Sequence, residues 1–128
     1  MVATRSEFLK QLEDIDEALG RFAAKTAEDV RALAQALAGD KQAIESVLAG
    51  DQPARRQRAL IEDICFDIML LQQPVAGDLR FVSGSFRLVS DLSHIGSMTR
   101  DIAFLSQSVP GEIVARVGEN LAASCEKT

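Results

Sequence analysis

The chain of 128 residues lacks tryptophan and tyrosine and has a single histidine, His94. Its two cysteines, Cys65 and Cys125, have neither a CxxC partner nor a neighbouring histidine, so they give no metal or redox motif. Nothing in the sequence pairs a nucleophile with a base, the arrangement that covalent and acid–base catalysis requires. The sequence therefore predicts a protein that is not an enzyme.

Basic clusters and long apolar runs are scarce as well. The formal net charge is −5, whereas a nucleic-acid surface needs clustered Lys and Arg to displace counterions from phosphates. No apolar run reaches the roughly 18 residues of a membrane-spanning helix, and the N-terminal residues have no signal-peptide pattern. We expect a cytoplasmic protein with no nucleic-acid partner and no membrane insertion.

The sequence shows helical periodicity throughout. Apolar residues recur at alternating steps of three and four, which is typical of helices packed in a bundle. The pattern predicts long helices over residues 6–38, 52–73 and 75–108, a short helix between the first two, and a further helix from Glu112. Gly39 and Asp40 suit the end of one helix and the cap of the next. The fold class is therefore all-α, an antiparallel three-helix bundle of up-down-up, spectrin-like type around one core.

The helix over residues 75–108 carries two apolar stripes. Leu79, Val82, Phe86 and Val89 form one, and Phe81, Leu88, Leu92, Ile95 and Ile102 form the other. A helix with two apolar stripes has two faces to bury, so we expect it to contact two neighbours. Residues 1–109 are predicted to be the bundle, and residues 110–128 the start of a further helix.

The stretch QQPVAGDLR, which includes Gln72, Gln73, Pro74, Asp78 and Arg80, predicts a sharp helix–helix junction. Pro74 can begin the second helix, and Asp78 suits its positive N-terminal end. As a pattern this stretch resembles the PhoU family, the accessory regulators of bacterial phosphate uptake. The resemblance extends from about residue 8 to residue 106.

The resemblance implies a fold with two tandem three-helix repeats, of which this chain matches the first. Residues 110–128 would then be a truncated second repeat or a dimerisation element. A homodimer could restore the two-bundle arrangement by placing a second copy where the second repeat would lie.

A second family motif, D-L-E-R-I-G-D, aligns with the segment DLSHIGS. The resemblance associates this motif with metal clusters, but Ser93 and Ser97 stand where the family has carboxylates, and His94 replaces the arginine. Gly96 is retained, which predicts a close helix–helix approach. We therefore expect no cofactor. The remaining candidate metal ligands are Asp63, Asp67, Asp91, His94 and Asp101, and a reduced metal site stays open as an alternative.

The resemblance implies a regulatory adaptor that down-modulates phosphate uptake and phosphate-starvation signalling. Its implied partners are the ATPase of the phosphate ABC transporter and the phosphate-sensing histidine kinase, with a homodimer expected. Two alternatives remain at this stage. One is a carboxylate-bridged, metal-binding helical bundle, and the other is an oligomeric helical scaffold unrelated to phosphate control.

Overall fold

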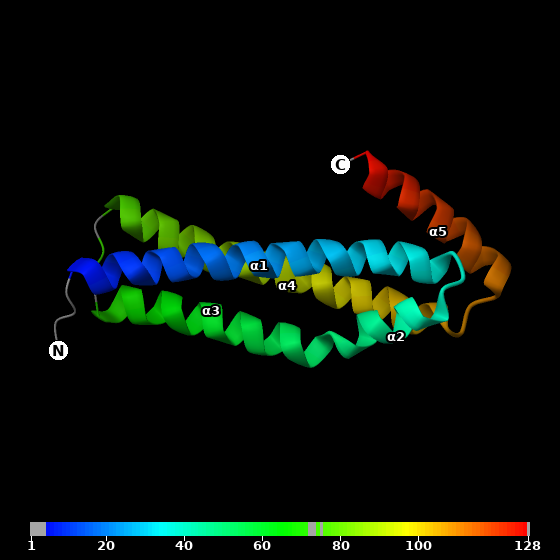
Figure 1. The fold of residues 1–128 in the computed structure, drawn as a ribbon, viewed down its shortest axis with the longest axis horizontal. Coiled ribbons are helices and arrows are strands. Elements are labelled where there is room, and N and C mark those ends of the chain that lie inside the picture. The colour runs from blue at the N-terminus through cyan, green and yellow to red at the C-terminus, as the bar shows by residue number, and fades with distance from the viewer. Residues whose placement is uncertain (1–4, 72–73, 75, 128) are drawn as a thin grey trace. The chain divides into compact units, whose positions relative to one another are not determined.

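The computed structural model describes residues 5–71, 74 and 76–127, and these residues form five α-helices and no strand (Figure 1). The helices are α1 (Arg5–Leu37), α2 (Lys41–Ala49), α3 (Asp51–Leu71), α4 (Ala76–Ser106) and α5 (Gly111–Glu126). The predicted all-α helical bundle is confirmed, and each expected helix lies close to its predicted bounds. Within the described ranges, no helix combines the length and apolar character that crossing a membrane needs.

The junction between α1 and α2 follows from two residues. Gly39 has a φ of 120°, a left-handed conformation in which glycine has no steric penalty, and its N–H donates to the carbonyl of Ala36 at 3.1 Å. Asp40 then caps α2, since its Oδ1 accepts from the backbone N–H groups of Gln42 and Ala43. The roles predicted for Gly39 and Asp40 are confirmed.

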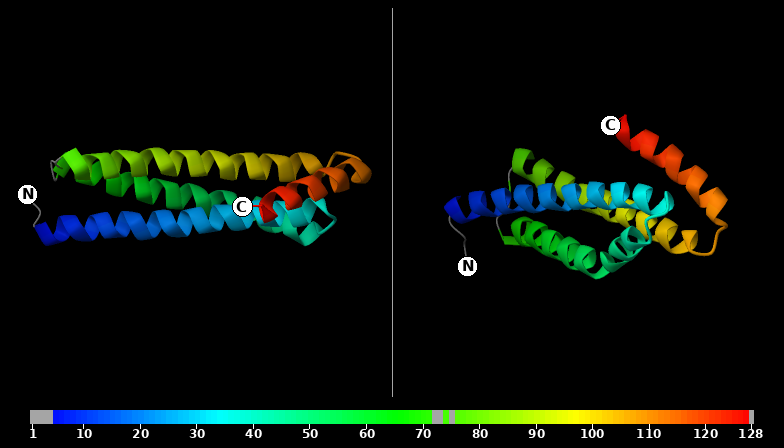
Figure 2. Two further views of the ribbon diagram at one scale, coloured as in Figure 1. Left: turned by 90° about the horizontal axis from the view of Figure 1, so that it is seen from above. Right: turned by 45° about the vertical axis from the view of Figure 1, so that its right-hand side comes forward.

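The helices are shared between two compact units, one made of residues 1–24 and 54–93 and the other of residues 25–53 and 94–128. In the first unit, α1 and α4 run in one direction and α3 runs in the opposite direction (Figures 1 and 2). Ten buried side chains from these three helices form its core: Phe8, Ile15, Ala18, Leu19, Phe22, Ile61, Cys65, Ile68, Val82 and Val89. Each fully buried isoleucine there contributes about 1.5–3 kcal/mol.

The second unit has a core of its own. Leu33 and Leu37 of α1, Val47 of α2 and Ala103 of α4 are buried there, with Val114 and Leu121 of α5 packed against them. The expectation of one core is therefore wrong, since the described residues form two separate apolar clusters. The predicted boundary between residues 109 and 110 stays a prediction.

A buried carboxylate lies beside the α2–α3 junction in this second unit. Asp29 is 6% exposed, and its Oδ1 lies 3.0 Å from Nζ of Lys25. The hydrogen bond to Asp29 raises the pKa of Lys25. Pairing of this kind offsets the cost of removing a carboxylate from water.

The two apolar stripes predicted for α4 differ in how far their side chains are buried. Val82 and Val89 of the first stripe are fully buried, but Phe81, Leu88, Ile95 and Ile102 of the second stripe are 40–47% exposed. The prediction that α4 contacts two neighbours is confirmed, because Val82 and Val89 share the core of the first unit with residues of α1 and α3. The second stripe is thus only partly covered within the chain.

At Gly118, α5 packs closely against the C-terminal end of α1. A Cβ atom added at Gly118 would lie 2.8 Å from the carbonyl carbon and the Cβ of Leu37. Real Cβ atoms do not approach a backbone so closely, so a side chain here would push α5 away from α1.

We predict that Gly118→Ala lowers the free energy of unfolding by about 1–3 kcal/mol, because overpacking against a backbone cannot be relieved by rotating a side chain. Thermal unfolding followed by circular dichroism measures this. Gly77→Ala is the matched control, since nothing lies within 4 Å of its added Cβ, and it should leave stability unchanged or raise it by up to about 1 kcal/mol. Equal effects of the two substitutions would contradict the packing of α5.

The burial of Cys65 affects both the pKa and the reactivity of its thiol. Burial raises the pKa of its thiol from 9.0 to about 11, with a smaller contribution from the charge of Glu62. The thiol therefore contributes stability that is fully present below its ordinary pKa and is lost as pH rises from about 9 to 11. In a Cys125→Ser background, we expect a thiol reagent to label the native protein at least about tenfold more slowly than the denatured protein. Equal rates would place Cys65 outside the core.

Candidate functional site

In the segment of α4 that resembles the metal-associated motif, residues 91–97, Asp91, His94 and Ser97 are exposed, and so is Asp101 one turn further on. Ser93 differs, because its Oγ is buried and has no hydrogen-bond partner. A hydroxyl without a partner costs free energy in the folded state, and the structure gives no compensating contact for it.

The acidic candidates on α3, Asp63 and Asp67, are also exposed. Among the described residues, no three side chains of the His, Cys, Asp and Glu types gather as a metal ion would require. The five candidate ligands are therefore not brought together, and whether the protein binds a metal stays a prediction.

The junction motif is described only in part. Gln72 and Gln73 lie outside the described residues, and Pro74 precedes α4. Asp78 lies in the first turn of α4, where its negative charge complements the helix dipole. Arg80 is exposed and lines a groove in the first unit with residues of α1 and α4.

Gly96 is buried, but its neighbour is not another helix backbone. A Cβ added there would lie 3.3 Å from Nη1 of Arg100, and its three nearest atoms all belong to that guanidinium group. Arg100 in turn places its Nε 3.1 Å from Oδ1 of Asp51, at the start of α3. The prediction of a close helix–helix approach at Gly96 is corrected: the missing side chain makes room for an arginine that ties α4 to α3 within the second unit.

One exposed face of α3 in the first unit combines acidic and apolar side chains. Leu60, Asp63, Phe66, Asp67 and Leu70 follow helical spacing and lie within about a third of the helix circumference. Leu60, Phe66 and Leu70 are 52%, 48% and 74% exposed. We call these five residues the outer face of α3.

Phe66, the aromatic residue of this face, is held in place by a contact with α4. The ring of Phe66 meets the ring of Phe86 of α4 edge to face, with the two centroids 5.3 Å apart and the planes at 77°. Such a pair contributes about 0.5–1.5 kcal/mol beyond burial. A turn earlier on α3, Nε of Arg58 donates to Oε1 of Glu62 at 2.7 Å, which adds order to this part of the helix.

Sequence reasoning singled out Asp63 and Asp67 as a carboxylate pair but missed the apolar residues around them. The helical spacing of Leu60, Phe66 and Leu70 can be read from the sequence. Their exposure cannot, because Leu60 and Leu70 continue the apolar pattern of the buried residues. The link from Arg100 to Asp51 was also missed. No local spacing could reveal it, since the two residues lie on different helices.

Comparison with known proteins gives one consistent family. The PhoU domain matches residues 19–105. The phosphate-specific transport system accessory protein PhoU homolog of Synechocystis sp. is 30% identical over 106 residues, which cover 82% of this chain and 47% of that protein. PhoU homolog 2 of Mycobacterium tuberculosis is 27% identical over 104 residues, which cover 80% of this chain and 49% of the relative.

The chain thus spans about half the length of these relatives. The homolog of Aquifex aeolicus shares a shorter match, 44% identical over 43 residues. No solved structure matches the chain significantly.

For the ion pair at Gly96, we predict that Arg100→Ala lowers the free energy of unfolding by about 1–2 kcal/mol, because it leaves a partly buried Asp51 without this guanidinium group. Chemical denaturation of the single variants Arg100→Ala and Asp51→Ala and of the double variant measures the coupling. Arg56→Ala, at an exposed position of α3, is the control and should change little. Additive effects of Arg100→Ala and Asp51→Ala would show that the pair contributes nothing.

Proposed function

Because the chain belongs to the PhoU family, we propose that it acts as a regulatory adaptor that down-modulates phosphate uptake and phosphate-starvation signalling. The observation that carries this proposal is the domain match over residues 19–105. It is supported by relatives that are named as accessory proteins of the phosphate-specific transport system. The proposed partners are the ATPase of the phosphate ABC transporter and the phosphate-sensing histidine kinase, both reached from the cytoplasm.

We assign partner binding to the outer face of α3. Exposed apolar side chains release water when a partner covers them, and aromatic residues held in a defined orientation lose little entropy on binding. Phe66 meets both conditions, since it is half exposed and rests against Phe86. Leu60 and Leu70 extend the apolar contact on either side of it.

The two carboxylates of this face supply the charge. Asp63 and Asp67 lie four residues apart on one side of α3 and point a double negative charge outward. A basic partner surface would be attracted to it, which raises the association rate more than the final affinity. The proposed mechanism is therefore binding that occludes or repositions a basic surface of the partner, without catalysis by this chain.

We also propose that two copies of the chain associate. Exposed apolar residues on α4, such as Phe81 and Leu88, form a surface that a second copy could cover. Neither a metal-binding role nor a plain scaffold role is favoured by a specific feature of the described residues.

Calorimetry with the transporter ATPase from the same organism tests the adaptor proposal. We expect saturable binding to this chain, weakened at least about fivefold by Leu70→Ala and by Asp67→Asn, because each removes part of the contact face. Leu70 is 74% exposed, so its truncation should leave the folded state intact.

Leu9→Ala is the matched control for Leu70→Ala. Leu9 is 45% exposed and belongs to α1, outside the five residues of the outer face of α3, so its truncation should leave the affinity unchanged. Absence of binding by a sample with a helical circular dichroism spectrum would refute the adaptor proposal for this chain. Binding that Leu70→Ala and Leu9→Ala weaken equally would refute only the assignment to α3.

A further inference from the structure

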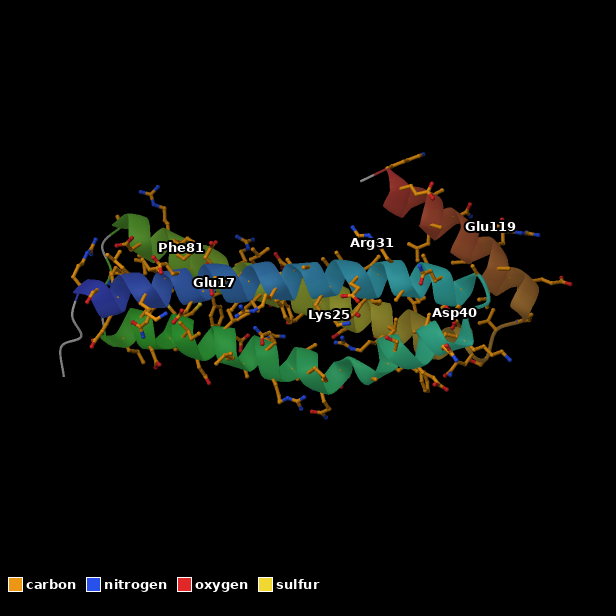
Figure 3. The ribbon with its side chains drawn as sticks, in the orientation of Figure 1. Glu17, Lys25, Arg31, Asp40, Phe81 and Glu119 are labelled. Atoms are coloured by element: carbon orange, nitrogen blue, oxygen red, sulfur yellow. The ribbon has the colours of Figure 1, made fainter. Side chains whose placement is uncertain are left out.

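A groove in the first unit lies between α1 and α4. Its volume is about 470 Å³. Its walls are mostly small or apolar: Leu19, Gly20 and Ala23 come from α1, and Phe81, Gly84 and Leu88 come from α4. Figure 3 labels Phe81 near the beginning of α4. The groove is thus an apolar surface between two helices that run in the same direction.

Two glycines, one on each wall, keep the groove open. Nothing lies within 4 Å of a Cβ added at Gly20 or at Gly84, so neither glycine is needed for the packing of this chain. Each costs its helix about 0.5–1 kcal/mol relative to alanine. A cost without a packing reason within the chain is consistent with close approach by another helix.

The groove also leaves large side chains open to solvent. Phe81 and Leu88 are 40% and 47% exposed, and they stand one heptad apart on the same stripe of α4. That spacing is the one at which a second helix can pack along the stripe over successive turns. A helix of another molecule could therefore pack along this wall of the groove.

Opposite charges distinguish the two walls. Asp16 lines the groove on the α1 side, and Arg80 lines it on the α4 side. Both side chains belong to exposed residues. The nearby Glu17 and Arg21 of α1 are 4.0 Å apart, an ion pair that adds no net charge to that wall.

These charges select one way of pairing two copies. A twofold axis across the helices would place each α1 against the other α1, so Asp16 would face Asp16 and Arg80 would face Arg80. An axis along the helices instead places α1 of one copy against α4 of the other. Asp16 then meets the partner's Arg80, and the reciprocal pair forms by symmetry. Charge complementarity therefore favours the second arrangement.

We propose that this groove is the interface of a homodimer, in which α1 and α4 of two copies form a four-helix contact with Asp16 and Arg80 paired across it. The inference rests on the association of two copies proposed above and names the surface that makes it. It is independent of the outer face of α3, which stays accessible to the adaptor's partner.

Sedimentation equilibrium of the full chain tests the interface through charge reversal. We expect the dimer dissociation constant of Asp16→Arg, and of Arg80→Asp, to rise at least about tenfold, because each variant places like charges against each other. An equimolar mixture of the two variants should recover the wild-type affinity as a heterodimer. In the mixed dimer opposite charges face each other again, because one variant chain is positive and the other negative on both walls. Loss in the single variants followed by this recovery is the result that pairing of Asp16 with Arg80 predicts.

Two further variants complete the test. Gly84→Gln fills the groove while favouring the helix, so it should weaken the dimer and keep or raise the melting temperature. Asp63→Arg makes the same charge change as Asp16→Arg on the exposed face of α3 and should leave the dimer unchanged.

The outcomes separate the proposals. A wild-type chain that is monomeric at every accessible concentration would overturn this inference and the proposed association of copies, whereas binding to the ATPase would stand. A dimer that charge reversal and Gly84→Gln leave intact would overturn only this interface. A dimer lost in the variants and not recovered in the mixture would overturn the pairing of Asp16 with Arg80.

Discussion

The burial of one stripe of α4 is the constraint on which both units depend. Val82 and Val89 are fully buried in the core of the first unit, and Ala103 is fully buried in that of the second. A helix can bury one stripe against two neighbours and leave the other stripe to solvent. Because Val82, Val89 and Ala103 are buried in the cores of the two units, the residues on the other side of α4 remain available for contacts with another molecule.

The contacts that hold this arrangement are of different kinds in the two units. The first unit depends on interdigitated apolar side chains from three helices and on the aromatic pair of Phe66 and Phe86. The second unit has a smaller apolar cluster and adds specific polar contacts, the pairs of Arg100 with Asp51 and of Lys25 with Asp29. Apolar packing tolerates modest changes of shape, whereas a partly buried ion pair requires both partners in place. The second unit should therefore be the more sensitive to single polar substitutions.

In the function proposed above, the chain acts through its surfaces. The acids that the structure describes do not gather into a metal-ligand set. What the fold does offer is two separate surfaces, an acidic and apolar face on α3 and a glycine-walled groove between α1 and α4. An adaptor needs at least two such surfaces if it is to bind a partner while associated with a second copy.

The helices, the junction at Gly39 and Asp40 and the family could be predicted from the sequence, because they depend on periodicity, on caps and on short motifs that lie within a few residues of each other. The sequence did not reveal which apolar residues of α4 are buried, that Gly96 accommodates Arg100, or that Gly118 meets the end of α1. Each of these depends on residues from different helices, whose separation in space is not encoded in local spacing. Apolar periodicity predicts that one face of a helix will be covered. Whether a helix of the same chain or another molecule covers it depends on how the chain packs.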